Sequence, residues 1–421
     1  MNTALTSVGS AAATVGASDP VDVSVVIPCL NEANSLAFCI DKATDAIRKA
    51  GLSGEVIIAD NGSNDGSVEI AEQHGARVIR VPERGYGAAL RAGIAATRGP
   101  FIIMGDADDS YDFADIDGFV KKLREGCELV MGCRLPRGGG TIMPGAMPWK
   151  NRWIGNPALS FVGRLFFRSP AQDFHSGLRA FTRDAYERME LKTTGMEFAS
   201  EMVIKATLKS MRIGEVPITL YKDGRSRPPH LKPWRDGWRH LRFMLIYSPR
   251  WLFLVPGLVL CLAGFAGANL TFWAPFKMGG VVFDAGTLMV ACMCMIIGVQ
   301  FVALACFTKV FGIGEGLLPD DPKFNGAFRF FTLERGILLG TAILLLGFGI
   351  LLRALWIWKQ ADYGSLDYSH NLRRLIAAAT LIVLAIQTIS SSFFMSVLGL
   401  KTSNRRPPSL PESGPAGSNA P

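Results

Sequence analysis

The chain has 421 residues, more than one ordinary domain, so at least two folded parts are expected. Hydrophobic residues make up 49% of it and the mean hydropathy is +0.25, values that argue against a wholly soluble protein. Much of the formal net charge of +8 lies in one basic stretch just before the first long apolar run. That position favours a membrane surface over nucleic acid as the partner.

The N-terminal segment, residues 1–20, is small and polar and is predicted to be disordered. The first 41 residues contain no Lys or Arg and no apolar core, so no signal peptide is expected. The folded part should therefore begin in the cytoplasm.

Residues 21–232 are predicted to form an α/β domain. Apolar, β-branched runs predict strands at Val23–Ile27, Glu55–Ala59, Arg77–Val81 and Phe101–Met104. Pro28 should end the first strand. Amphipathic or glycine-bounded segments predict helices at Ala33–Ala50, Ser67–His74 and Gly85–Thr97. This alternation predicts parallel βαβ units with helices on both faces of the sheet.

Three polar clusters follow the first, second and fourth strands: Asn31-Glu32, Asp60–Asp65 and Asp106–Asp109. Because ligands of such sheets bind beyond the carboxyl ends of the strands, the clusters predict a site. The spacing of Asp106 and Asp108 lets both carboxylates turn to one Mg²⁺ or Mn²⁺ ion that keeps positions open for substrate phosphates. An exposed acidic turn is the alternative interpretation.

The chain has neither a G-x-G-x-x-G helix start nor a Walker A lysine, which excludes the common dinucleotide and P-loop sites. Gly85, at a glycine-rich helix start, could let a diphosphate approach backbone N–H groups, and a plain tight turn is the alternative. Glu32 and Asp60 could bond base or ribose. Together these features predict a nucleotide-sugar pocket in which the metal neutralises the departing diphosphate.

Two arginines after the metal site are candidates for binding an acceptor phosphate. Arg134 follows a predicted core strand, Glu128–Met131, and Arg227 lies in Gly224-Arg225-Ser226-Arg227 near the expected membrane edge. Their planar guanidinium groups suit a phosphate, although most single arginines are surface charges. His175, among apolar residues, is expected to be structural rather than catalytic.

Residues 233–250 alternate Arg with Trp, Phe and Tyr and predict a basic amphipathic helix on an anionic leaflet. Residues 251–400 predict a four-span domain, with apolar runs at Trp251–Ala274, Ala285–Thr308, Gly336–Trp358 and Leu375–Leu400. A soluble four-helix core is the alternative, which uncharged runs of this length disfavour.

Short-loop charges place the catalytic domain and the tail in the cytoplasm. The third loop, with Lys359, Arg373 and Arg374, is more basic than an outer loop should be. Residues 401–421 are predicted to be a disordered tail. The eight cysteines show no metal-binding spacing and are expected to be reduced.

Several motifs together resemble a known family. Ser24–Glu32, Asp60-Asn61-Gly62-Ser63, Gly105–Asp108 and Gly224–Arg227 are similar to motifs of family-2 glycosyltransferases with the GT-A (Rossmann-like) fold. Within that family the chain resembles dolichol-phosphate mannose or glucose synthases and bacterial polyprenyl-phosphate glycosyltransferases. Asp173–Arg179 matches the family's Asp-x-x-Ser/Cys-Gly-x-Arg/Lys pattern, which adds Arg179 to the acceptor-phosphate set.

The resemblance implies roles for individual residues. Contacts to the nucleotide are implied for Pro28, Asn31, Glu32, Asp60 and Asp106. Asp106 and Asp108 would hold the metal. Members of this group often have Gln two residues after the second Asp, where this chain has Ser110. The further ligand could then be Ser110, Asp109 or water.

The implied activity is inverting transfer of a hexose, from a donor of the UDP-glucose or GDP-mannose type, to a polyprenyl phosphate such as undecaprenyl phosphate. The product would be a lipid-linked sugar donor for assembly of cell-envelope glycans or glycoproteins. The implied location is the inner (plasma) membrane, in a multi-pass protein, and a homo-oligomer is left open. A processive polysaccharide synthase is an alternative, but the chain lacks the usual Gln-x-x-Arg-Trp motif. A non-catalytic nucleotide-sugar-binding membrane module is another, against which Asp106 and Asp108 argue.

Overall fold

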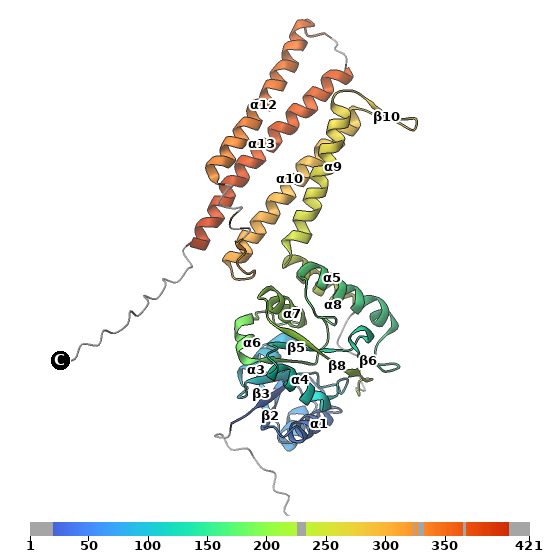
Figure 1. The fold of residues 1–421 in the computed structure, drawn as a ribbon, viewed down its shortest axis with the longest axis vertical. Coiled ribbons are helices and arrows are strands. Elements are labelled where there is room, and N and C mark those ends of the chain that lie inside the picture. Colours follow the sequence, from blue (N-terminus) through green and yellow to red (C-terminus); the bar gives the residue numbers. More distant parts are fainter. Residues whose placement is uncertain are drawn as a thin grey trace, which may run out of the picture. The chain divides into compact units, whose positions relative to one another are not determined.

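The computed structural model describes residues 20–224, 233–322, 332–364 and 368–403, together with positions 324 and 326. The chain divides between Met244 and Leu245 into two compact units, one α/β and one helical (Figure 1). The described residues do not include Arg227, residues 1–19 or residues 404–421. They therefore leave out most of the two terminal segments that were predicted to be disordered.

A seven-stranded sheet organises the N-terminal unit, in the order β3-β2-β1-β4-β7-β5-β8. Its strands are β1 Val23–Cys29, β2 Gly54–Asp60, β3 Arg77–Arg80, β4 Phe101–Met104, β5 Leu129–Cys133, β7 Arg179–Thr182 and β8 Ile213–Pro217. Most neighbours pair in parallel, as predicted, but β7 runs antiparallel to both β4 and β5. The parallel arrangement predicted for the first four strands is therefore confirmed, and β7, for which no strand was predicted, begins at the edge where its neighbours end.

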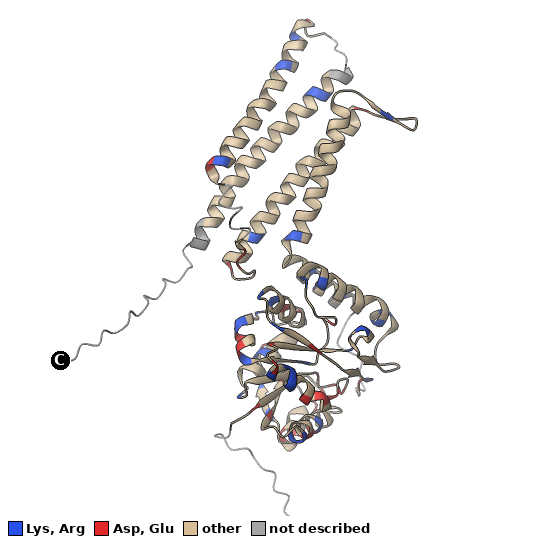
Figure 2. Ribbon diagram, viewed as in Figure 1, with Lys and Arg blue, Asp and Glu red and all other residues tan. Residues whose placement is uncertain are grey.

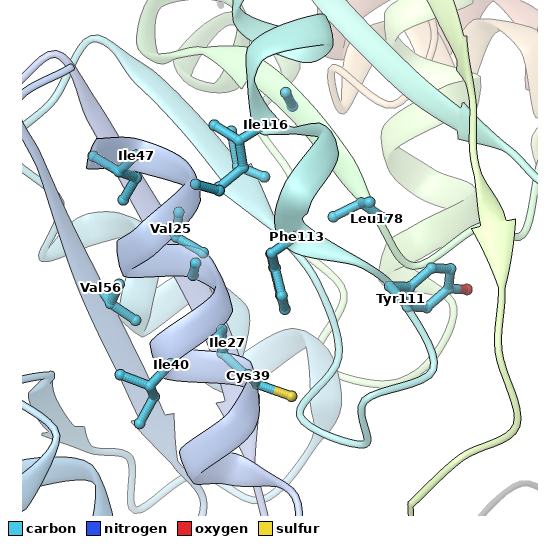
Figure 3. Packing of buried hydrophobic residues seen from close by; sticks show 14 of the residues in the cluster. Val25, Ile27, Cys39, Ile40, Ile47, Val56, Tyr111, Phe113, Ile116 and Leu178 are labelled. Atoms are coloured by element: carbon cyan, nitrogen blue, oxygen red, sulfur yellow. The ribbon is translucent and has the colours of Figure 1, made fainter. Parts of the chain in front are cut away.

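Helices cover both faces of the sheet, as the alternation predicted. Helices α1 (Leu36–Lys49), α2 (Ser67–Gln73) and α4 (Ile116–Arg124) pack on one face, and α3 (Tyr86–Ala95) and α7 (Phe198–Leu208) on the other. The α1 side chains Ile40 and Ile47 are buried in one cluster with Val25 and Phe113 (Figure 3). Each buried Ile or Phe stabilises this core by roughly 1.5–3 kcal/mol through removal from water.

The remaining elements lie mainly beyond β5 in the chain. Short helical turns occur at Phe113–Asp115, Pro136–Gly138 and Asn151–Gly155. Three helices complete the set: α5 (Asn156–Phe167), α6 (Arg183–Met189) and α8 (Pro233–Ile246). A small parallel pair joins β6 (Thr141–Ile142) to β9 (Thr219–Leu220).

Strand β1 passes through Pro28 instead of ending there. Val26 O accepts from Gly105 N on the β4 side, and Cys29 O accepts from Asn61 N on the β2 side. The backbone polar groups of alternate residues of β1 therefore point to β4 and to β2. Pro28 faces the β4 side, where pairing has already ended at Val26. Its missing N–H therefore leaves no ladder bond unmade, and this is why a proline is tolerated in a central strand.

Four long helices form the second unit: α9 (Val255–Phe272), α10 (Ala285–Gly314), α12 (Leu333–Gln360) and α13 (Tyr368–Ser403). Within the described ranges, four helical segments are long and apolar enough to cross a membrane, with mean hydropathies of 2.0 to 2.5. Charged residues lie mainly toward the ends of these helices (Figure 2). A short hairpin, β10 (Phe276–Met278) and β11 (Val281–Phe283), joins the first two. The four predicted spans are thus present as candidate membrane helices.

An ion pair offsets part of the excess charge of the third loop. Arg373, near the start of α13, is buried and donates to Asp284, the residue that caps the N-terminus of α10. Since the loops after the first and third spans lie on the same side of a four-span protein, this carboxylate can offset one of the arginines. Lys309 and Asp321 pair near the other end of α10.

Candidate active site

The loops after β1, β2 and β4 meet at one edge of the sheet because these strands are parallel neighbours. The three predicted polar clusters therefore lie next to one another. Strand β7 adds its preceding loop, residues 173–178, to the same edge because it runs in the opposite direction. Four loops from distant parts of the chain thus contribute to this region.

Side-chain hydrogen bonds join the first two loops. Asn31 adopts a positive φ of 58°; its N–H donates to Ser63 Oγ (2.9 Å) and its Oδ1 accepts from Asn64 N (2.8 Å). Glu32 N donates to Ser67 Oγ (3.0 Å). The Asn31 side chain therefore helps to hold the loop in shape. If it also contacts a nucleotide, it does so while keeping this bond.

An open cavity of about 560 Å³ lies beyond β2 and β3. Asp60, at the end of β2, lines it together with Ser63, Glu69 and Arg80. The Asp60 carboxylate accepts from the backbone N–H groups of Gly62 and Ser63, at 3.1 Å each. The volume falls within the range of about 300–1,000 Å³ found for small-molecule sites.

The glycine-rich start of α3 is occupied by the protein itself. Gly85 N donates to Asn61 Oδ1 (2.7 Å), and Ala88 N donates to Thr194 O (3.1 Å). Gly85 has a φ of +143°, and a Cβ atom there would collide with Thr194 O. The Gly85 N–H is thus bonded inside the protein, and the approach of a diphosphate to it stays a prediction. The glycine lets the 193–195 loop approach α3, and the tight-turn alternative is the better account.

Hydroxyl groups hold both carboxylates of the predicted metal site. Tyr86 OH donates to Asp106 Oδ1 (2.9 Å), and Gly177 lies so close to Asp106 Oδ2 that a Cβ atom would collide with it. Ser110 donates to Asp108 Oδ1 from both Oγ (2.6 Å) and N (3.0 Å). The two carboxylates are thus oriented by the protein.

This donor set fits a magnesium-type ion. Among the described residues, no cluster of three His, Cys, Asp or Glu side chains is placed to hold a metal. Mg²⁺ is commonly bound by one or two carboxylates and by substrate phosphates, so Asp106 and Asp108 are sufficient for it. Ser110 is committed to Asp108, and Asp109 pairs with Lys42 at 2.8 Å. The suggestion of Ser110 as a ligand is therefore revised to a positioning role, and water becomes the candidate for the further ligand.

Arg134 is held in a buried ion pair. Its Nε donates to Asp173 Oδ2 (2.7 Å), its Nη2 to Asp173 Oδ1 (2.8 Å) and its Nη1 to Tyr111 OH (3.2 Å). Burial raises the pKa of Asp173, but the charge and hydrogen bonds of Arg134 outweigh it and hold that pKa below its usual value. The guanidinium of Arg134 is thus paired inside the protein, and its contact with an acceptor phosphate stays a prediction.

Arg179 is also internal. It is fully buried, and its guanidinium donates to the carbonyls of Ser176 (2.8 Å), Phe174 (3.0 Å) and Ala199. Burial lowers the pKa of this guanidinium to about 10. Its assignment to the acceptor phosphate likewise stays a prediction, and burial does not favour it. Arg227 lies outside the described residues, and its role stays a prediction.

His175 extends the polar network toward α8. Its ring lies 4.8 Å from the ring of His240, whose Nδ1 is 2.8 Å from Ser200 Oγ. Burial, followed by the neighbouring His240, lowers the pKa of His175 well below its usual value. A histidine kept neutral in this way is consistent with a structural role.

Comparison with known proteins places the chain in a family. Residues 24–189 match the family "Glycosyl transferase family 2", and residues 306–399 match "Glycosyltransferase family 2 C-terminal transmembrane region". The low-salt glycan biosynthesis hexosyltransferase Agl6 of Haloferax volcanii is 35% identical over 387 residues, which cover 90% of this chain and 89% of that protein. The chain belongs to glycosyltransferase family 2.

Two further comparisons cover a smaller part of the chain. The dolichyl-phosphate hexose transferase of H. volcanii is 31% identical over 220 residues, 51% of this chain and 89% of that protein. A crystal structure of glucosyl-3-phosphoglycerate synthase from Mycobacterium tuberculosis is 25% identical, has a TM-score of 0.43, and covers 54% of this chain and 79% of its own. The two family matches and the four candidate membrane helices confirm the predicted order of this family-2 glycosyltransferase, a GT-A domain followed by transmembrane helices.

Sequence motifs of the glycosyltransferase did not identify three polar partners. Tyr86 stands between two glycines whose pattern points to the backbone, and Asp173 opens a pattern whose basic residue is Arg179. Their partners, Asp106 and Arg134, lie 20 and 39 residues away. Tyr111 follows the metal motif, but no sequence signal pointed to it.

Proposed function

We propose that this glycosyltransferase moves a hexose from a nucleoside diphosphate sugar to a polyprenyl phosphate, with inversion at the sugar carbon. The observation that carries the proposal is the position of Asp106, Asp108 and the cavity at Asp60 on one edge of the sheet. The relative named dolichyl-phosphate hexose transferase supports a lipid phosphate as acceptor.

The donor would lie along this edge. We assign its nucleoside to the cavity, where Asp60 and Arg80 offer partners for ribose and base. Pro28, near the end of β1, and Asn31 and Glu32, in the loop after it, would border the cavity. Asp106 and Asp108 would hold Mg²⁺ or Mn²⁺, which when bound neutralises the diphosphate as it leaves.

The supporting hydroxyls would act before the reaction begins. Tyr86 and Ser110 fix the directions of Asp106 and Asp108, so the site need not reorganise when donor arrives. The burial of Tyr86, together with the neighbouring Asp106, raises its pKa well above the usual value. The phenol therefore stays protonated at neutral pH and remains a donor to the carboxylate.

The acceptor phosphate needs a cation but no general base. A polyprenyl phosphate is already an anion at neutral pH, so no side chain has to remove a proton to make it nucleophilic. It must approach a second anion, the donor diphosphate, and a positive side chain beside it would offset the repulsion. Because Arg134 and Arg179 are committed inside the protein, we assign this role to Arg227.

We place the reaction at the cytoplasmic face of the plasma membrane. The distribution of charge among the short loops supports this side for the GT-A domain, residues 21–232. Residues 233–250 would lie on the leaflet and residues 251–400 would span it four times. The product, a lipid-linked hexose, would serve as donor for cell-envelope glycan or glycoprotein assembly.

The test uses full-length protein in liposomes that contain undecaprenyl or dolichyl phosphate, with a panel of UDP- and GDP-sugars and Mg²⁺ or Mn²⁺. Mass spectrometry of the extracted lipid should show one added hexose with one donor class. Asp108→Asn should abolish the product while the protein stays folded, and Asp117→Asn, an exposed carboxylate on α4, should not. A polymeric product would favour a processive synthase, and donor binding without any product would favour a non-catalytic module.

A further inference from the structure

Helix α7 carries a buried ion pair. Glu201 is fully buried, and Lys205, one turn further along the helix, is 3% exposed. Their side chains lie 2.9 Å apart, and Lys205 Nζ also donates to Glu190 O (2.6 Å). Removing two charges from water is unfavourable, so such a pair persists only where further hydrogen bonds satisfy both members. The other partners of Glu201 therefore indicate what this carboxylate holds in place.

The Glu201 carboxylate binds the loop that precedes α7. It accepts from the backbone N–H groups of Lys192 (3.1 Å) and Thr193 (2.9 Å) and from the Thr193 hydroxyl (2.7 Å). Burial raises the pKa of Glu201, but the bonds from Thr193 and Lys205 outweigh it and hold that pKa below its usual value. Because residues 191–194 have no regular secondary structure, these bonds fix the path of their backbone.

The same loop contacts the start of α3. Thr194 O accepts from Ala88 N (3.1 Å), and a Cβ atom on Gly85 would collide with that oxygen. A Cβ atom on Gly87 would lie 2.6 Å from Thr193 O. The two glycines thus allow the loop and the first turn of α3 to pack backbone against backbone. A displacement of the loop would therefore move this turn.

The first turn of α3 carries a side chain of the candidate metal site. Tyr86 is the first residue of the helix, between Gly85 and Gly87, and its hydroxyl donates to Asp106 Oδ1 (2.9 Å). A shift of the phenol by about 1 Å would lengthen this distance beyond that of a hydrogen bond and release Asp106 to turn. The direction of Asp106 therefore depends on the loop that Glu201 holds.

We propose that Glu201 is a positioning residue for the metal site. It holds the loop before α7, the loop holds the first turn of α3, and Tyr86 in that turn orients Asp106. The inference rests on the proposed role of Asp106 as a metal ligand, and it extends that site to a carboxylate that acts through Tyr86. Outer partners of metal ligands commonly set metal affinity in this way.

Mn²⁺ binding to the full-length protein in nanodiscs tests this role. Electron paramagnetic resonance would follow Mn²⁺ titrated alone and with UDP or GDP, so the measurement does not depend on turnover. Glu201→Gln keeps the shape of the side chain but replaces one acceptor oxygen by an amide donor. The Kd for Mn²⁺ should rise about three- to tenfold.

The same titrations separate failure of the inference from failure of the proposed function. Wild-type affinity in Glu201→Gln would refute the positioning role and leave the metal site intact. Equal Mn²⁺ binding by the wild type and Asp108→Asn, or no binding by the wild type under any of these conditions, would refute the metal site itself. A loss of turnover in Glu201→Gln at unchanged Mn²⁺ affinity would give Glu201 a direct part in the reaction and overturn the proposal.

A double-mutant cycle distinguishes positioning from a general loss of stability. Tyr86→Phe removes the hydroxyl that orients Asp106 and should itself raise the Kd for Mn²⁺. If Glu201 acts through Tyr86, Glu201→Gln should change the Kd little further in the Tyr86→Phe background. Two effects that multiply in the double variant would mean that the residues act independently, against the proposal.

Glu55 supplies a matched control. It is a buried carboxylate near the start of β2, at the opposite end of that strand from Asp60, and it accepts from Ser24 Oγ (2.8 Å) and Arg98 N (2.7 Å). Glu55→Gln should lower the melting temperature and leave the Kd for Mn²⁺ unchanged. A rise in Kd equal to that of Glu201→Gln would show that loss of any buried carboxylate disturbs the site.

Thr193 keeps the proposal testable if Glu201→Gln does not fold. Thr193→Val removes one hydroxyl bond to Glu201 and should raise the Kd for Mn²⁺ by about two- to threefold. Thr193→Ser retains a hydroxyl and should restore the affinity. Unchanged affinity in Thr193→Val would break the proposed connection between the loop and the metal site.

Discussion

Replacing Asp173 by Asn should destabilise the N-terminal unit by about 3–5 kcal/mol, because it leaves the buried Arg134 cation without its counter-charge. The side chains of Arg134 and Asp173 are 7% and 0% exposed, and two short hydrogen bonds join their planar groups. Asn keeps the size of Asp but has one acceptor oxygen, whereas Nε and Nη2 of Arg134 each need one. At about 2–4 °C per kcal/mol for a unit of this size, the melting temperature should fall by roughly 6–20 °C.

The assay is thermal unfolding of the full-length protein in nanodiscs, with a control and a double variant. Arg188→Met breaks a more exposed pair with Glu128 and should cost about 1 kcal/mol or less. The double variant Arg134→Met/Asp173→Leu should be more stable than either single variant, since replacing both members of a buried pair by apolar groups removes the unpaired charge.

A different pattern would refute this account of Arg134. If Arg134→Met melted like the wild type and only raised the KM for polyprenyl phosphate, the fork would be available to the acceptor and the pairing with Asp173 would be dispensable. The pair would then have been assigned the wrong role. That kinetic effect is instead expected for Arg227→Met, with little change in melting temperature.

Three other predictions follow from the same geometry. Ser110→Ala removes a hydroxyl that donates to Asp108 and should weaken Mn²⁺ binding, measured by calorimetry, by about two- to tenfold, with recovery in Ser110→Thr; unchanged affinity would contradict the positioning role. Because burial lowers the pKa of His175, protonation favours the unfolded chain, so stability should be complete above about pH 6.5 and be lost as the pH falls below it. Melting curves at several pH values should show this loss, and His175→Gln should flatten it. Cysteines introduced near Lys277 and near Lys323 should be labelled from opposite sides of the membrane. A cysteine near Tyr363 should be labelled from the same side as Lys277, because Arg373 pairs with Asp284. Labelling of all three from one side would exclude four simple spans.

The sequence by itself determined those features that depend on neighbouring residues. The apolar stripe of α1 and the uncharged runs of the membrane helices are visible in the chain because periodicity and length are local properties. The polar clusters after β1, β2 and β4 were predicted to meet because parallel strands place their carboxyl ends together. Asp106 and Asp108 were therefore identified as a candidate pair before any contact was known.

Tertiary structure decided which polar groups are available to a ligand. The antiparallel strand β7 brings Asp173 to Arg134 across 39 residues of sequence and pairs this arginine inside the protein. Thr194 O accepts from Ala88 N at the α3 start beside Gly85, and Arg373 reaches Asp284 across 89 residues. Each of these pairings depends on the order and direction of elements far apart in the chain. A single sequence carries no periodic signal for such pairings, so they become visible only when the sheet and the helices are assembled.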